Sequence, residues 1–91
     1  MAAELSFGRI IRTSARAQPH FPLIMVTVEQ SLDYLQELPL ATLDENHWRA
    51  ASEALWNAVD YPDNAARLVA ADRALCMALA TEGWLNEVPP A

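Results

Sequence analysis

The chain has 91 residues, of which 53% are hydrophobic, and a formal net charge of −6 at pH 7. Two glycines and six prolines are too few, and the apolar content too high, for a disordered chain. Six arginines and no lysine against twelve acids disfavour direct nucleic-acid binding, which needs a basic surface. We expect a single domain over residues 1–91, structured over about 6–85 and followed by a flexible tail at 86–91.

Two β-strands are predicted near the N-terminus. Residues 6–13 (SFGRIIRT) and 21–28 (FPLIMVTV) are rich in β-branched side chains. Residues 15–20 (ARAQPH) between them are typical of a turn. The pattern predicts a β-hairpin, and because two strands alone are not stable, the hairpin needs either a helical layer against one face or a partner strand on an edge.

The first two helices are predicted from their start and stop signals. Thr27-x-x-Gln30 is a capping box that opens the first helix, and Pro39 ends it near residue 37 or 38. Thr42-x-x-Glu45 is a second capping box, which predicts a helix from there to about residue 59.

The third helix is predicted to run to about residue 82. Asp60 is expected to cap its start, and Gly83 offers the left-handed stop at its end. The order of elements predicts an α+β fold, with an N-terminal two-stranded β-hairpin followed by three α-helices packed on one face.

One face of the second helix is apolar. Ala51, Leu55 and Val59 fall within about 60° of Trp48 at about 100° per residue, so Trp48 is expected in the core. Trp56 lies about 80° off this stripe. It either packs under a neighbouring element or anchors a partner, since Trp is enriched in binding hot spots.

Asp72 interrupts the apolar stripe that leucines form along the third helix. A carboxylate there must be hydrogen-bonded, ion-paired or at the rim of the core. It could act as a general acid or base. Alternatively it is a buried structural partner of an arginine, of the Trp48 indole or of backbone amides. The structural role is favoured because no second catalytic carboxylate stands at a suitable spacing.

The third helix is apolar over more than one face. Val69 widens the apolar arc, Cys76 flanks the leucines, and Met77 points away from them. Such a helix is either central or part of a dimer surface. The candidate interface residues are therefore Trp56, Val69, Cys76 and Met77, although a free cysteine is also typical of a core.

No catalytic, metal or cofactor motif is found in the sequence. The single cysteine excludes an internal disulfide and a Cys-based zinc site. His47 is expected on a solvated surface, although pairing with Glu45 or Asp44 would make it a candidate base. His20 is placed in the hairpin turn, and the two histidines lack a metal-binding spacing. We expect no metal, no cofactor and no enzymatic activity.

Charge is unevenly distributed along the chain. Residues 1–28 carry +2, from Arg9, Arg12 and Arg16 against Glu4, and residues 29–91 carry −8. The arginines could form a basic patch for an anionic ligand.

No signal-peptide pattern and no apolar run of ~20 residues is present. These features predict a cytoplasmic protein without a membrane segment.

The chain resembles a bacterial family called domain of unknown function 982 over residues 7–82. The resemblance rests on the hairpin, on VEQSLDYLQELP (residues 28–39), on WRAASEALWNAV (residues 48–59), and on Ala66-Arg67 at the start of the last helix. The family typically has Trp where this chain has Leu38, and often Cys where it has Leu55. The resemblance implies a fold and no reaction.

Three functions remain open from the sequence. The favoured one is a small non-enzymatic interaction or regulatory module that acts as a homodimer or binds another protein. The alternative is an acidic decoy or inhibitor of a basic nucleic-acid-handling partner, motivated by the −8 segment. The third is a small enzyme that uses Asp72 with a histidine.

Overall fold

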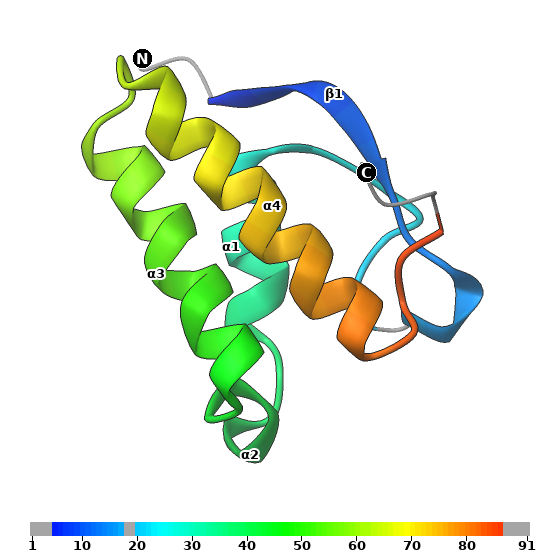
Figure 1. The fold of residues 1–91 in the computed structure, drawn as a ribbon. Helices are drawn as coiled ribbons and strands as arrows, with labels where there is room; N and C mark the ends of the chain where they lie inside the picture. Colours follow the sequence, from blue (N-terminus) through cyan, green and yellow to red (C-terminus); the bar gives the residue numbers. More distant parts are fainter. Residues whose placement is uncertain (1–4, 18–19, 87–91) are drawn as a thin grey trace.

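The computed structural model describes residues 5–17 and 20–86, without the side chain of Arg9. Its elements are β1 (Ser6–Arg12), the 3-10 turn η1 (Ala15–Ala17), β2 (Ile24–Thr27), α1 (Val28–Gln36), α2 (Leu40–Leu43), α3 (Asn46–Asp60) and α4 (Ala65–Thr81). Figure 1 shows α3 and α4 side by side, with α1 behind them and β1 running past the far side of α4. The predicted α+β class is confirmed. Over the described ranges no helix combines the length and the apolarity needed to cross a membrane.

The sheet is a small antiparallel one. Ile11 lies opposite Met25 and Arg12 opposite Ile24, and the register shifts between Ser6 and Ile11. Ile11 and Met25 are fully buried, whereas Ile24 is 44% exposed. The side chains therefore alternate between a face that packs on the helices and a face that meets solvent.

A segment after α4 lies along the other edge of β1. The Asn86 N–H donates to the Arg12 carbonyl at 3.0 Å, and Thr13 and Leu85 form an isolated bridge. The sheet thus gains a short third strand at an edge of the predicted two-stranded hairpin, in addition to the helices on its face. Of the predicted flexible tail only residue 86 is described, and residues 87–91 lie outside the described part.

The free edge of β2 is closed by one side chain. The Gln30 Oε1 accepts from the Val26 N–H at 2.9 Å, and the Gln30 Nε2 donates to the Ile24 carbonyl at 3.4 Å. The Gln30 N–H donates to the Thr27 Oγ1 at 3.1 Å, so Thr27 is the N-cap of α1 as predicted. The backbone N–H of Gln30 therefore receives the Thr27 cap, while its side chain bonds edge groups of β2 that another strand could pair with, and not the Thr27 N–H as in a capping box.

Two predicted helix starts are wrong. Thr42 lies inside the short helix α2, and α3 begins after Glu45, whose side chain does not cap it. Asp60 ends α3, and the cap of α4 is Asn64, which accepts from a backbone N–H of the first turn. The predicted stop is confirmed, because Gly83 has a φ of +74°.

The short helix α2 was missed because Pro39 has two effects. It cannot continue α1, but its φ of −55° also suits the start of a new helical turn. The structure consequently has four helices in its described part where three were predicted.

The core is continuous across the sheet and the long helices. Trp48 and Leu55 are fully buried, as predicted, while Arg49 and Glu53 on the opposite side of α3 are exposed. The Trp48 ring stacks on Phe21 with centroids 5.7 Å apart and planes 11° apart. Trp84, for which no role was predicted, packs against the same two rings.

We expect Thr27→Ala to lower the free energy of unfolding by about 1 kcal/mol, because it removes the side chain that caps α1. Thr42→Ala is the matched control, since Thr42 caps no helix in the structure. We expect its effect to stay within about 0.5 kcal/mol. Urea denaturation followed by circular dichroism measures both, and equal losses would contradict this assignment of the caps.

Candidate functional site

The residues predicted as an interface are found in different environments. Trp56, Val69 and Met77 are 46%, 52% and 69% exposed, respectively. Cys76 is only 5% exposed and belongs to the core. It is therefore not available on the surface with the other three, and the core role that its residue type favours is the one observed.

The exposed residues also lie on different sides of the molecule. Val69 and Met77 are eight residues apart on α4 and share its outer face. On α3, His47 marks the side that meets α4, because it contacts Glu82. Trp56 follows nine residues later, which at about 100° per residue places it on the opposite side of α3. The predicted interface therefore divides into an α4 face and a separate tryptophan.

Asp72 is half-buried and accepts a hydrogen bond from the Cys76 thiol, with 3.3 Å between Sγ and Oδ1. The Trp48 indole is not its partner, because the Trp48 Nε1 is buried and makes no hydrogen bond. Neither His20 nor His47 bonds to it within the part of the chain that the structure describes; His20 instead stacks on Trp84. The geometry thus gives no support to a pairing of Asp72 with a histidine.

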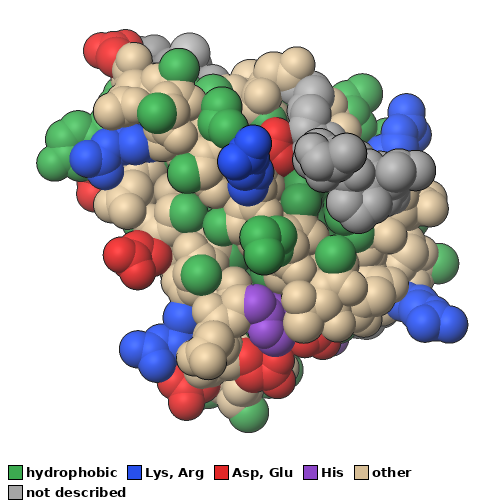
Figure 2. Space-filling model, viewed as in Figure 1, with side chains coloured by type: hydrophobic (Ala, Val, Ile, Leu, Met, Phe, Trp, Pro, Cys, Tyr) green, Lys and Arg blue, Asp and Glu red, His purple; other side chains and the backbone are tan. Residues whose placement is uncertain are grey.

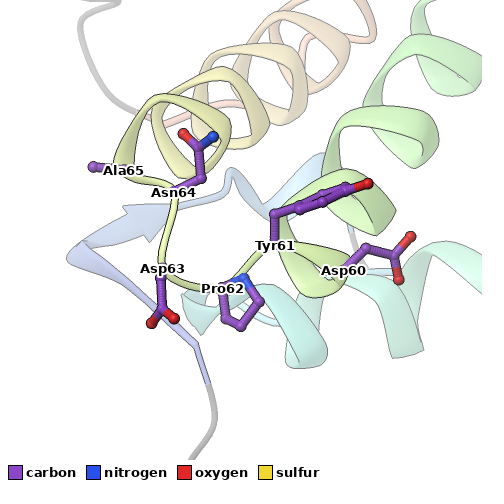
Figure 3. Close-up of a pocket in the computed structure, with 6 residues that line it drawn as sticks. All are labelled: Asp60, Tyr61, Pro62, Asp63, Asn64 and Ala65. Carbon is purple, nitrogen blue, oxygen red and sulfur yellow. The ribbon is translucent and has the colours of Figure 1, made fainter.

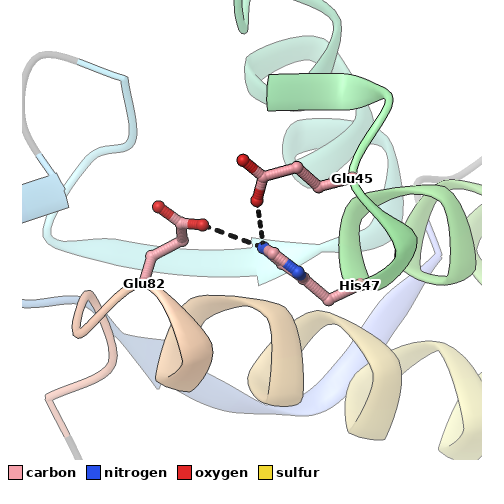
Figure 4. Close-up of side chains that lie close together, drawn as sticks. All are labelled: Glu45, His47 and Glu82. Carbon is pink, nitrogen blue, oxygen red and sulfur yellow. Dashed lines mark hydrogen bonds and ion pairs between the residues drawn. The ribbon is translucent and has the colours of Figure 1, made fainter. Parts of the chain in front are cut away.

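A cluster of one histidine and two glutamates joins the start of α3 to the end of α4 (Figure 4). The His47 Nε2 lies 2.9 Å from the Glu82 Oε1 and 3.2 Å from the Glu45 Oε2. The side chains of His47 and Glu82 are 22% and 25% exposed, and that of Glu45 is 50% exposed. The prediction of a solvated His47 is therefore wrong, and its pairing with Glu45 is the alternative that the structure shows.

The local structure explains why the three side chains converge. Glu45 is the N-cap residue of α3, but its carboxylate turns to the imidazole instead of capping the helix. Glu82 is the C-cap residue of α4. Because α3 and α4 run antiparallel, the beginning of one lies beside the end of the other (Figure 1). Glu82 is 35 residues away from His47 in sequence, so no local sequence motif could have indicated the cluster.

Two carboxylates meeting one imidazole nitrogen can bind a proton or a metal ion. An unprotonated Nε2 would face two negative oxygens, which is repulsive, so either a proton on Nε2 or a metal ion has to stand between the nitrogen and the carboxylates. The three ligand atoms all lie within 4.8 Å of one another. Among the residues described, a histidine and two carboxylates at this spacing could hold a metal ion.

A shallow depression lies at the turn between α3 and α4 (Figure 3). It is lined by residues 60–65. The side chains of Asp60 and Asp63 point in different directions in Figure 3 and do not converge. The Arg67 guanidinium lies 4.0 Å above the Tyr61 ring, a cation–π contact that orders the turn. The depression therefore offers no arranged set of ligand groups.

Acidic side chains do not form a continuous row on the face shown in Figure 2. Most of those visible stand singly, and a small group gathers at the lower end beside a histidine. A mimic of nucleic acid needs charges in a row at the spacing of phosphates. Of the predicted basic patch, Arg12 and Arg16 are exposed, and the Arg9 side chain lies outside the described part.

The chain matches no protein-family model, no curated protein and no solved structure. The resemblance to domain of unknown function 982 therefore stays a prediction.

Proposed function

We propose that the protein is a small non-enzymatic interaction module of the cytoplasm, and that it forms a homodimer through the outer face of α4. The observation that carries this proposal is the composition of that face. Eight residues of α4 are exposed: Ala65, Ala66, Val69, Ala70, Arg73, Met77, Ala80 and Thr81. Only Arg73 among them is charged, whereas the solvent face of a helix is usually polar.

Figure 2 shows the consequence for the surface. Hydrophobic side chains cross the middle of this face, where Figure 1 places α4, and one basic side chain stands among them. Exposed contiguous apolar surface of this kind is typical of binding surfaces. The alanines allow a second helix to approach closely, and the long stem of Arg73 can lie on apolar surface while its guanidinium reaches the rim.

The charge distribution of the chain is compatible with a second copy as the occupant of the α4 face. Two chains with a net charge of −6 repel one another, so they associate best where acidic groups are absent. No aspartate or glutamate is among the exposed residues of α4. A contact between two α4 faces therefore brings together the least repulsive parts of the two molecules.

The sheet is a less suitable surface for the same contact. Its outer face carries Ile10, Ile24 and Val26, each partly exposed. The edge of β2, however, is occupied by the Gln30 amide, so a second copy cannot extend the sheet there without displacing it.

Sedimentation of the purified chain over a range of concentrations tests the proposal. We expect a dimer, and we expect Met77→Lys to raise its dissociation constant at least tenfold, because a charge would enter the apolar contact. Leu40→Lys is the matched control, since Leu40 is 84% exposed on α2. Ile24→Lys tests whether the dimer forms instead through the outer face of the sheet. A monomer, or a dimer disrupted by Ile24→Lys and not by Met77→Lys, would reject the α4 contact.

A further inference from the structure

We propose that Glu45, His47 and Glu82 bind one divalent transition-metal ion of the zinc class, which ties the start of α3 to the end of α4. The proposal does not depend on the dimer. It concerns the three residues that Figure 4 shows converging from the start of α3 and the end of α4.

The spacing of the ligand atoms fits a single ion. Zinc lies roughly 2.0–2.2 Å from imidazole nitrogen and carboxylate oxygen, so two ligand atoms of a tetrahedral site are about 3.3 Å apart. The two distances at the His47 Nε2, 2.9 and 3.2 Å, are already close to this value. The two carboxylate oxygens, within 4.8 Å of each other, need only a small side-chain movement to complete the triangle.

The electrostatics of the site favour a cation. Two carboxylates around a neutral imidazole leave a charge of −2, and within the described residues neither glutamate forms an ion pair with an arginine. Glu82 also stands at the C-terminal end of α4, where the helix dipole is negative and a carboxylate is disfavoured. A bound divalent cation compensates the charge of −2 and lies favourably near the negative end of the α4 dipole. A single proton would compensate only half of that charge.

The ligand types select the ion. Imidazole nitrogen suits zinc and neighbouring transition metals, whereas calcium and magnesium prefer sites made of oxygen alone. The Nδ1 of His47 makes no hydrogen bond within the described part of the chain, so it can keep the ring proton while Nε2 faces the metal. Three protein ligands leave the fourth position of a tetrahedral zinc ion for water, and the partial exposure of the site admits it.

Calorimetric titration of the full chain with Zn²⁺ tests the site. We expect saturable binding of one ion per chain. We expect His47→Gln and Glu82→Gln each to weaken it at least tenfold, since each removes one of three ligands. The matched controls are His20→Gln, at the other histidine, and Glu53→Gln, at an exposed acid of α3, and we expect both to bind like the parent chain. Circular dichroism confirms that each variant is folded.

A second measurement separates a metal site from simple attraction to acidic charge. Co²⁺ quenches tryptophan fluorescence at short range, and the Trp48 and His47 rings are only 5.6 Å apart. We expect Co²⁺ to quench the parent chain and excess Zn²⁺ to reverse the effect, while Ca²⁺ does not. Absence of saturable Zn²⁺ binding, equal competition by Ca²⁺, or unchanged affinity in both His47→Gln and Glu82→Gln would overturn the proposal.

Discussion

Trp48→Ala is expected to lower the free energy of unfolding by about 3–5 kcal/mol, which is a large part of the total for a domain of this size. The side chain is fully buried and is the largest in the core. It stacks on Phe21 and packs against Trp84, so its removal leaves a cavity between the sheet side and the helices. Urea denaturation followed by circular dichroism measures the loss.

Trp48→Phe is the informative comparison. The Trp48 Nε1 is buried without a hydrogen bond, and an unpaired buried N–H costs about 1–3 kcal/mol. The substitution to phenylalanine removes part of the buried ring but also removes this unpaired N–H. We therefore expect the free energy of unfolding to fall by at most about 1.5 kcal/mol. If Trp48→Phe were as damaging as Trp48→Ala, the indole N–H would have to contribute a favourable interaction, such as one to an ordered water.

The local features of the fold could be predicted because short segments determine them. Thr27 caps α1 and Gly83 ends α4, and both effects depend on a few neighbouring residues. Trp48 and Leu55 were placed in the core from their helical spacing alone. The same reasoning from local sequence failed at Thr42. A capping box requires a helix that starts at its threonine, but Pro39 starts the short helix α2 before Thr42.

The candidate metal site could not be predicted from spacing. Glu45 and His47 are near neighbours in sequence, but the third ligand, Glu82, follows a complete helix pair later. Only the antiparallel packing of α3 and α4 brings it to the imidazole. The short strand around Leu85 was missed for the same reason, because its partner Thr13 lies at the other end of the chain.

Small residues between α3 and α4 set the distance on which the metal site depends. One turn after His47 comes Ala51, and one turn before Glu82 comes Ala78; both alanines are fully buried. Their small side chains allow the two helix backbones to approach closely. A larger residue in this layer has to force the helices apart or adopt an unfavourable rotamer.

Ala51→Leu is therefore expected to lower the free energy of unfolding by about 1–3 kcal/mol and to weaken Zn²⁺ binding. Ala50→Leu is the matched control, because Ala50 is exposed on the same helix and leucine has nearly the helix propensity of alanine. We expect its effect to stay within about 0.5 kcal/mol, with unchanged zinc affinity. If Ala51→Leu destabilised the fold but left zinc affinity intact, the ion would have to be bound away from the α3–α4 junction. If both variants were equally stable, the two helices could not be closely packed at Ala51.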